Sequence, residues 1–323
     1  MALILAGIVV VVQAPPATRM REEKRAGMQV LAFEGGCAKD ADRPNTWHRA
    51  RYALHVERGR GMSEQSARWK GGVSMNKTDK LAQIIQGSSR MVFFGGAGMS
   101  TESGIPDFRS ADGIYSQSLS RAFRPEEMVS HTFLLQHPQA FFDFLFGKMI
   151  FLDARPNDGH RALASLEARG KLCAVITQNI DGLHQMAGSK AVYELHGSLM
   201  RWSCTECGRR YSLAYALQER KTHPIPRCRE CGGIVRPDVV LYEEPLDGRV
   251  IEHSVKAIRQ ADTLIVGGTS LAVYPAAGLL DYFHGDHLVV INRTATKADQ
   301  SASLLIREPI GEVLRAAGII RAI

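Results

Sequence analysis

The chain has 323 residues, of which 45% are hydrophobic and 23% charged, an ordinary globular composition that favours one or two domains. The formal net charge is +7, but residues 75–323 hold 28 Lys or Arg against 26 Asp or Glu, which excludes a strongly basic nucleic-acid-binding body. No apolar run in the sequence reaches the roughly 18 to 20 residues of a membrane helix.

Residues 1–74 show no regular hydrophobic period and read unlike the remainder of the chain. The apolar stretch at residues 2–14 is short and lacks the basic start of a good signal peptide. Lys70-Gly71-Gly72, just before Met75, can be encoded by a purine-rich ribosome-binding sequence. Our hypothesis is that translation starts at Met75 and that residues 1–74 are an over-extended reading of the gene. The alternative is a natural, disordered extension without a function of its own.

From Met75 onward, helices and strands are expected in alternation. Residues 76–88 predict an amphipathic helix ended by Gly87, and residues 90–96 predict a buried strand that runs into a glycine turn. Later apolar runs predict further strands at 171–179, 261–270 and 287–294, with helical stretches at 159–170, 252–261 and 275–283. This order predicts an α/β fold with a Rossmann-like, doubly wound parallel sheet, which binds ligands beyond the carboxyl ends of its strands.

Two segments interrupt the alternation and predict a smaller second domain. Residues 113–158 are rich in Phe and Leu and look helical, and their Phe cluster at 141–146 is expected to be core; residues 201–236 carry four cysteines. We therefore expect a zinc-ribbon plus helical domain made of about 113–158 and 201–236. The Rossmann part would comprise about 75–112, 159–200 and 237–323.

The four cysteines follow the pattern Cys-x2-Cys-x20-Cys-x2-Cys, at Cys204, Cys207, Cys228 and Cys231. Two such pairs place four thiolates around a tetrahedral Zn²⁺, and four protein ligands leave no open position for a substrate. The pattern therefore predicts a structural zinc site, typical of a reducing compartment. The alternative is two redox-active dithiols.

The glycine-rich stretch after the first strand matches a dinucleotide-binding turn only in part. Gly96 and Gly98 follow the strand, but Thr101 stands where a third glycine would be expected. A lone Gly-x-Gly is weak evidence for a nucleotide. Small or amide side chains also follow three later strands, in "TQNIDGLH", "GGTS" and "NRT", where they could approach phosphates and ribose hydroxyls.

Six motifs then occur in a fixed order: "GAGMSTESGIPDFRS", "TQNIDGLH", "ELHGS", the paired cysteines, "GGTSLAVYPAA" and "INRT". Together they resemble the sirtuin family of NAD-dependent protein deacylases, over residues 75–323. The resemblance implies a Rossmann domain that holds NAD as co-substrate, a small domain with structural Zn²⁺, and acyl-lysine protein substrates between them. It also implies transfer of the acyl group to ADP-ribose, which yields nicotinamide, O-acyl-ADP-ribose and free lysine.

The resemblance also assigns site residues to matching positions. His196 would be the general base, because an imidazole that titrates near neutral pH suits removal of a ribose hydroxyl proton. Asn179 and Asp181 would be the other catalytic residues, although Asn179 could merely cap a helix. The implied NAD contacts are Gly96, Ala97, Gly98, Thr101, Phe108, Arg109, Gln178, Asn179, Ile180, Asp181, His196, Gly268, Thr269, Ser270, Asn292 and Ile310. Val240 and Leu241 would bind the substrate peptide through main-chain groups, whereas His184 is expected to be structural.

The sequence departs from the family pattern at two places that bear on the substrate. "VVLYEEPLD" replaces the usual Val-x-Phe-Gly-Glu, which leaves the peptide preference near Glu243 open, with a basic flank as one candidate. The Tyr-x-x-Arg pair of succinyl-removing sirtuins is absent from the nearest matching place, Phe142 and Leu145. A dicarboxylate chain would lack a cation there, so acetyl or longer neutral acyl groups are expected.

Three other functions compete with this interpretation: an NAD-dependent protein ADP-ribosyltransferase, an oxidoreductase, and a non-enzymatic zinc-ribbon binding protein. No hydride-transfer pair accompanies the glycine-rich stretch, which disfavours the oxidoreductase. For partners, the sequence predicts acyl-lysine proteins, with no direct contact to nucleic acid or membrane. We expect a cytoplasmic monomer.

Overall fold

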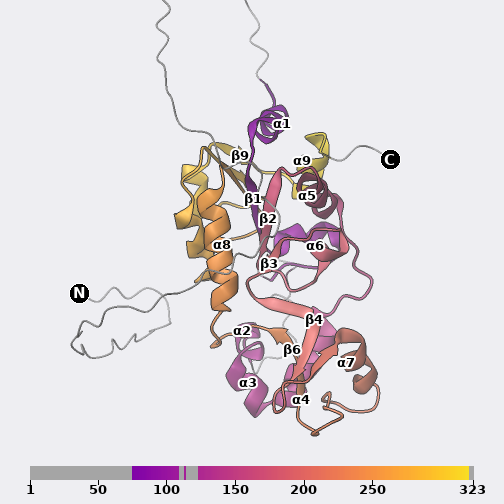
Figure 1. Ribbon diagram of the computed structural model, residues 1–323. Helices are drawn as coiled ribbons and strands as arrows, with labels where there is room; N and C mark the ends of the chain where they lie inside the picture. The colour runs from indigo at the N-terminus through magenta and orange to yellow at the C-terminus, as the bar shows by residue number, and fades with distance from the viewer. Residues whose placement is uncertain (1–74, 109–112, 114–122, 320–323) are drawn as a thin grey trace, which may run out of the picture. The chain divides into compact units, whose positions relative to one another are not determined.

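The computed structural model describes residues 75–108, 113 and 123–319. The hypothesis about residues 1–74 lies outside this range. Within it, six parallel strands form one sheet in the order β3-β2-β1-β7-β8-β9 (Figure 1). Their bounds are β1 Met91–Gly95, β2 Leu172–Thr177, β3 Val192–Glu194, β7 Thr263–Gly267, β8 His287–Ile291 and β9 Leu304–Ile306.

Both faces of this sheet are buried, because successive strand side chains point to opposite sides. In β1, Met91 and Phe93 belong to one hydrophobic cluster, and Val92 and Phe94 belong to another. The first cluster is covered by α1 (Lys77–Gly87), α5 (Asp158–Ala168) and α9 (Ile310–Ala316). The second is covered by α8 (Gly248–Gln260) and the 3₁₀ helix η4 (Ala276–Tyr282), so the helices lie on the two faces of the sheet (Figure 1).

The predicted doubly wound parallel sheet is thus confirmed. The chain proceeds from β1 outward through β2 and β3, and then returns to build β7, β8 and β9 on the other side. The point at which the direction changes lies at the carboxyl end of β1, where a doubly wound sheet binds its ligands. The stretch predicted as a helix at 275–283 is a 3₁₀ helix. The three-residue strands β3 and β9 were not predicted.

A second hydrophobic core lies outside the parallel sheet. Strands β4 (Gly197–Cys204), β5 (Arg210–Ser212) and β6 (Val235–Val239) form an antiparallel sheet in the order β5-β4-β6. This sheet extends beyond the 201–236 segment expected from the cysteines. It shares its core with the helical insertion, α2 (Pro125–Met128), α3 (His131–Gln136) and α4 (Pro138–Phe144), and with α7 (Leu213–Arg220).

The Phe cluster belongs to this second core, as expected. Phe142 is completely buried and stacks on Trp202, and Phe146 stacks on the same indole. Aromatic stacking of this kind adds to the free energy that burial alone supplies. A short π-helical turn at Leu145–Met149 ends the helical part of the insertion.

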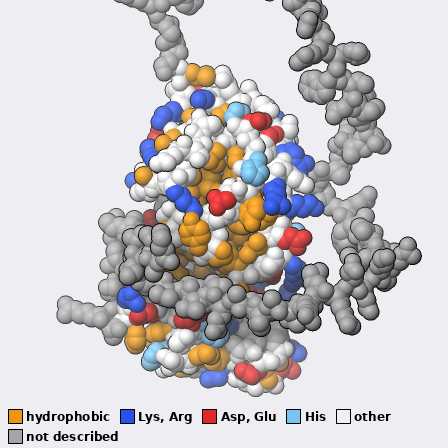
Figure 2. All heavy atoms as spheres, turned by 90° about the vertical axis from the view of Figure 1, so that its left-hand side faces the viewer, with side chains coloured by type: hydrophobic (Ala, Val, Ile, Leu, Met, Phe, Trp, Pro, Cys, Tyr) orange, Lys and Arg blue, Asp and Glu red, His pale blue; other side chains and the backbone are white. Residues whose placement is uncertain are grey.

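The described surface carries charges of both signs. Figure 2 shows basic and acidic side chains interspersed around an apolar area on one face of the described residues. Among these residues, no helix is long and apolar enough to cross a membrane.

Candidate active site

A cavity of about 1210 Å³ opens at the carboxyl edge of the parallel sheet and reaches the second core. Its lining comes from the loops after β1, β2, β7 and β8 and from the segment after β6. The cavity lining includes the following predicted residues: Gly96, Ala97, Gly98, Thr101, Phe108, Gln178, Asn179, Ile180, Asp181, His196, Val240, Leu241, Gly268, Thr269, Ser270, Asn292 and Ile310. Arg109 lies outside the described residues. The fold therefore gathers predicted residues from seven chain segments around one space.

Glycines let two strand ends approach each other at the floor of the cavity. The Gly98 N–H donates to the Gly268 carbonyl at 2.8 Å. A Cβ on Gly98 would lie 2.8 Å from the Gly268 Cα, and Gly268 itself has φ +60°, a conformation that side chains disfavour. No larger residue fits at either position without moving backbone. The turn after β1 is therefore held directly against the turn after β7 at the floor of the cavity.

A buried polar cluster lies beside the glycines. The Ser100 hydroxyl donates to Asp181 Oδ2 at 2.6 Å, and Asn179 Nδ2 donates to Ser100 Oγ at 3.1 Å. Burial raises the pKa of Asp181, although hydrogen bonds from Ser100 and from the Leu183 N–H oppose the rise. Sequence reasoning did not single out Ser100, whose only signal was a hydroxyl between Gly98 and Thr101.

Asn179 does not cap the following helix. The N-cap of α6 (Leu183–Met186) is Gly182, and the Leu183 N–H is taken by Asp181 Oδ1 at 2.9 Å. The helix-capping alternative for Asn179 is therefore wrong. Its amide instead holds Ser100 within the polar cluster.

His196 is half-buried between β3 and β4, with one ring nitrogen fixed by the main chain. Its Nδ1 lies 3.0 Å from the Gln178 carbonyl oxygen. A carbonyl only accepts, so Nδ1 carries the proton and Nε2 of the neutral ring is left as an acceptor. Burial lowers the pKa of His196, an effect that the Gln178 hydrogen bond partly opposes. The following residue, Gly197, has φ +75°, and a Cβ there would lie 1.9 Å from the Asp238 carbonyl oxygen.

The far end of the cavity is built by residues after β7, β8 and β9. Gln178 Nε2 donates to Thr269 Oγ1 at 2.9 Å, and Asn292 Nδ2 donates to the Thr294 carbonyl at 2.9 Å. Ile310 begins α9, and Glu102 from the glycine-rich segment accepts from the Gly311 N–H at 2.8 Å. The last contact joins residues 209 positions apart in the sequence, so no local pattern could have indicated it.

The helical insertion contributes an apolar wall. The cavity-lining residues from this side are Val129, Phe141, Leu145, Met149, Ile150, Phe151, Leu152 and Ala154. Phe142, which we paired with Leu145 as the place of a missing cation, lies in the core and does not line the cavity. Within the described lining, Arg293 is the single Lys or Arg residue.

The main chain of the predicted peptide-binding segment is largely engaged within the protein. The Val240 N–H donates to the His196 carbonyl at 3.0 Å, and the Leu241 N–H donates to Glu244 Oε2 at 2.9 Å. Tyr242 forms an isolated parallel bridge with Ser130. The segment is thus fixed between the histidine-bearing turn and the helical insertion.

The four predicted metal ligands converge at the edge of the second core, which buries Cys204 and Cys228 and leaves Cys207 and Cys231 exposed. Their Sγ atoms all lie within 4.8 Å of one another, with Cys204 and Cys231 3.4 Å apart and Cys207 and Cys228 3.6 Å apart. Thiolates about 2.3 Å from a tetrahedral Zn²⁺ are separated by about 3.8 Å, so this donor set fits zinc.

Comparison with known proteins identifies the family to which this arrangement belongs. Residues 96–275 match the family model described as the Sir2 family. The chain belongs to the Sir2 family. An NAD-dependent protein deacetylase of Clostridium acetobutylicum is 57% identical over 240 residues, which are 74% of this chain and 97% of that protein.

Solved Sir2 structures share the fold. A Sir2 protein with a p53 peptide and NAD⁺ is 35% identical, with a TM-score of 0.65 over 73% of this chain and 95% of that one. Sir2Tm bound to a propionylated peptide is 35% identical, with a TM-score of 0.67 over 76% of this chain and 100% of that one. The Sir2 match covers the glycine-rich segment, His196 and all four cysteines.

Proposed function

We propose that this Sir2 protein is an NAD-dependent protein-lysine deacetylase that transfers the acyl group to ADP-ribose. The observation that carries the proposal is the single cavity in which the glycine floor, the polar cluster of Ser100 and Asp181, and the His196 ring lie together. Two comparisons support the proposal. The 57% identical relative is named an NAD-dependent protein deacetylase, and a solved structure similar to this chain contains a p53 peptide and NAD⁺.

His196 would act as the general base. With Nδ1 bound to the Gln178 carbonyl, Nε2 is available to accept a proton from a ribose hydroxyl of the co-substrate. Asn179 and Asp181 would organise the nicotinamide and ribose end through Ser100. NAD supplies the bond to nicotinamide whose cleavage activates the ribose carbon.

The remaining predicted contacts would bind the co-substrate or the peptide. The turns after β1 and β7, which Gly98 and Gly268 allow to lie against each other, would form the floor beneath the phosphates. Phe108, which packs against the second core, would cover the reacting centre and exclude water. The ribose, phosphate and adenosine ends would meet Gly96, Ala97, Thr101, Arg109, Gln178, Ile180, Thr269, Ser270, Asn292 and Ile310, and the peptide would meet Val240 and Leu241.

The acyl group is expected to be neutral. The helical wall of the cavity is apolar, and a dicarboxylate acyl chain placed against it would lose hydration without gaining a cation. The propionylated peptide bound by a solved neighbour shows that a Sir2 protein accepts a short neutral chain. The cysteine site would hold Zn²⁺ as a structural ion, and reduced thiolates agree with a protein that works in the cytoplasm.

The test measures nicotinamide release and peptide deacylation in parallel. With an acetyl-lysine peptide and NAD, we expect both products in equal amounts, and a succinyl-lysine peptide should react far more slowly. His196→Ala should slow the formation of both products by at least about 10²-fold while zinc content stays unchanged. NAD consumption without any acyl-lysine peptide would instead favour the ADP-ribosyltransferase, and desuccinylation at a comparable rate would contradict the acyl preference.

A further inference from the structure

The segment from Leu241 to Glu244 forms a rim of the cavity and joins β6 to α8. Its main chain pairs with the start of the helical insertion: the Tyr242 N–H donates to the Val129 carbonyl at 3.1 Å, and the His131 N–H donates to the Tyr242 carbonyl at 3.1 Å. Any movement of this rim relative to α3 therefore breaks hydrogen bonds. Of the two residues that the family resemblance assigns to the peptide, Val240 lies immediately before the rim and Leu241 begins it.

Glu243 has an unusual backbone within this rim. Its φ is +76°, in the left-handed region, where the Cβ of an L-residue is disfavoured. Of the non-glycine residues that the structure describes, Leu271 is the single other example. Contacts of the side chain or its neighbours must therefore hold this conformation in place.

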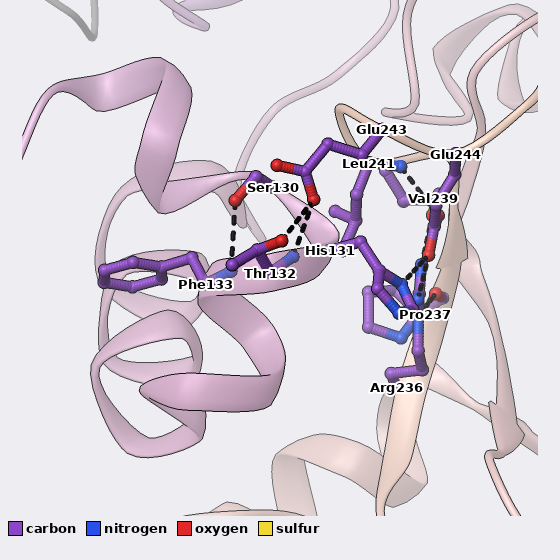
Figure 3. A network of polar contacts seen from close by, with 10 residues as sticks. All are labelled: Ser130, His131, Thr132, Phe133, Arg236, Pro237, Val239, Leu241, Glu243 and Glu244. Atoms are coloured by element: carbon purple, nitrogen blue, oxygen red, sulfur yellow. Dashed lines mark hydrogen bonds and ion pairs between the residues drawn. The ribbon is translucent and has the colours of Figure 1, made fainter.

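The Glu243 carboxylate makes two such contacts with Thr132. Its Oε2 atom accepts from the Thr132 N–H at 2.9 Å and from the Thr132 hydroxyl at 2.7 Å, as Figure 3 shows. These hydrogen bonds lower the pKa of Glu243, with the larger effect from the Thr132 hydroxyl, and keep the carboxylate ionised at neutral pH. The carboxylate is thus directed at the protein's own helix α3.

The next residue, Glu244, fixes the rim to β6 and also to α3. It accepts from Arg236 at 2.5 and 2.9 Å and from the Leu241 N–H at 2.9 Å, and its Oε1 lies 2.8 Å from His131 Nδ1 (Figure 3). Partial burial opposes ionisation, but hydrogen bonds led by those from Arg236 outweigh it and lower the pKa of Glu244 to about 2. Two consecutive carboxylates therefore tie one segment to α3 and to β6.

We propose that Glu243 is a positioning residue for the acyl-lysine peptide: by binding Thr132 it holds the Val240–Leu241 main chain in the geometry that the peptide pairs with. This inference rests on the proposed deacetylase function. The sequence left open that Glu243 binds a basic residue flanking the acyl-lysine. In the present proposal the Glu243 carboxylate instead binds Thr132 and acts on the rim of the cavity. A preorganised rim lowers the ordering cost of peptide binding and leaves the NAD end of the cavity unaffected.

The test compares variants on both sides of the contact in the full chain. Glu243→Ala removes the carboxylate but keeps the disfavoured Cβ, and Glu243→Gly removes both. Thr132→Val removes one of the two hydrogen bonds and keeps the main-chain donor. Glu243→Gln keeps a carbonyl acceptor and is the conservative rescue. Glu252→Ala, which deletes an exposed carboxylate on α8, is the matched control for charge.

We expect Glu243→Ala to raise the KM for an acetyl-lysine peptide about fivefold, because the variant loses the hydrogen bonds that fix the rim. Glu243→Gly and Thr132→Val should show smaller increases, and Glu243→Gln should fall nearest to the wild type. The KM for NAD and kcat should stay within about twofold, and the thermal midpoint should fall by only a few degrees. Combining Glu243→Ala with Thr132→Val should add little, because both remove the same contact.

Two results would overturn the inference. One is an unchanged peptide KM in both Glu243→Ala and Glu243→Gly; the other is a parallel loss of kcat and of NAD affinity. Thr132→Val carries the same test if Glu243→Ala does not fold. If the wild-type protein fails to deacetylate, the proposed function is wrong. Fluorescence anisotropy of the labelled acetyl-lysine peptide then decides about Glu243 separately, since Glu243→Ala must still weaken binding.

Discussion

The Gln178 carbonyl and burial together set the protonation of the His196 ring. The 3.0 Å contact places the proton on Nδ1, and burial lowers the pKa of the ring below its ordinary value. At neutral pH the ring is consequently uncharged, with Nε2 free to accept a proton. A general base needs this state before the reaction begins.

Activity should therefore depend on pH through His196. Because the pKa is lowered, kcat/KM should be level above neutrality and should fall only as the pH drops below about 6.5. His196→Ala should lower kcat by about 10²- to 10⁴-fold, while the Kd for NAD changes little, because the other cavity contacts remain. A pH–rate profile and NAD titrations of both proteins provide the measurement. His196 would not be the general base if kcat/KM began to fall already above pH 7 on acidification, or if the variant kept an unchanged kcat.

At the scale of elements, two histidines join α5 to α6 in the interior. His160 and His184 are 0% and 1% exposed, and their ring centroids lie 4.7 Å apart. Among the described residues, no hydrogen-bond partner is available for His160 Nε2 or for either ring nitrogen of His184. Burial lowers the pKa of His160 to about 4, with Arg161 adding to the effect. Burial also lowers the pKa of His184 well below its ordinary value, with His160 adding to the effect.

These two rings should make the fold sensitive to acid. Below the ordinary pKa of about 6.5 the unfolded chain binds protons that the folded chain cannot, so stability is lost as the pH falls from 6.5 toward 4. For His160 alone the free energy of unfolding should drop by about 2 kcal/mol between pH 7.5 and pH 5. Urea unfolding at both values measures the drop.

His160→Gln should reduce this loss, whereas His284→Gln, at an exposed position, should leave it unchanged. Equal unfolding midpoints of the wild-type protein at pH 7.5 and pH 5 would contradict the account. The prediction concerns packing between α5 and α6 and is independent of catalysis, because neither ring lines the cavity.

Sequence patterns predicted the central elements and failed at the edges. The long apolar runs of β1, β2, β7 and β8 are buried on both faces, which leaves an unbroken hydrophobic signal. Strands β3 and β9 have three residues each, too few for a recognisable period.

The cavity residues could be predicted from the sequence where they belong to a recognisable motif. Ser100 and the contacts of Glu102 and Glu243 depend on partners far away in the sequence, which no local pattern encodes.

At the scale of the whole molecule, the cysteine site anchors the second core and one wall of the cavity. Cys204 and Cys228 are buried in the same hydrophobic cluster as Phe142, Trp202 and Leu241. Because Leu241 also lines the cavity, the cysteine site and this wall of the cavity share one packed unit. Loss of the metal should therefore affect both stability and substrate binding.

Removing a ligand tests this coupling. The wild-type protein should contain one zinc ion per chain, and Cys228→Ser should lose the ion and unfold at a markedly lower temperature. The matched variant Cys173→Ser, on β2, should keep both properties. Metal analysis and thermal unfolding decide the matter. A metal-free protein with an unchanged unfolding midpoint and unchanged peptide KM would show that the site is not structural.

We infer that the cavity transfers an acyl group from lysine to ADP-ribose. Mass spectrometry of the products formed from an acetyl-lysine peptide and NAD distinguishes this reaction from its alternatives. We predict O-acetyl-ADP-ribose, nicotinamide and the deacetylated peptide in equal amounts. A peptide that gains the mass of ADP-ribose, or NAD cleavage that leaves the peptide acetylated, would contradict the claim.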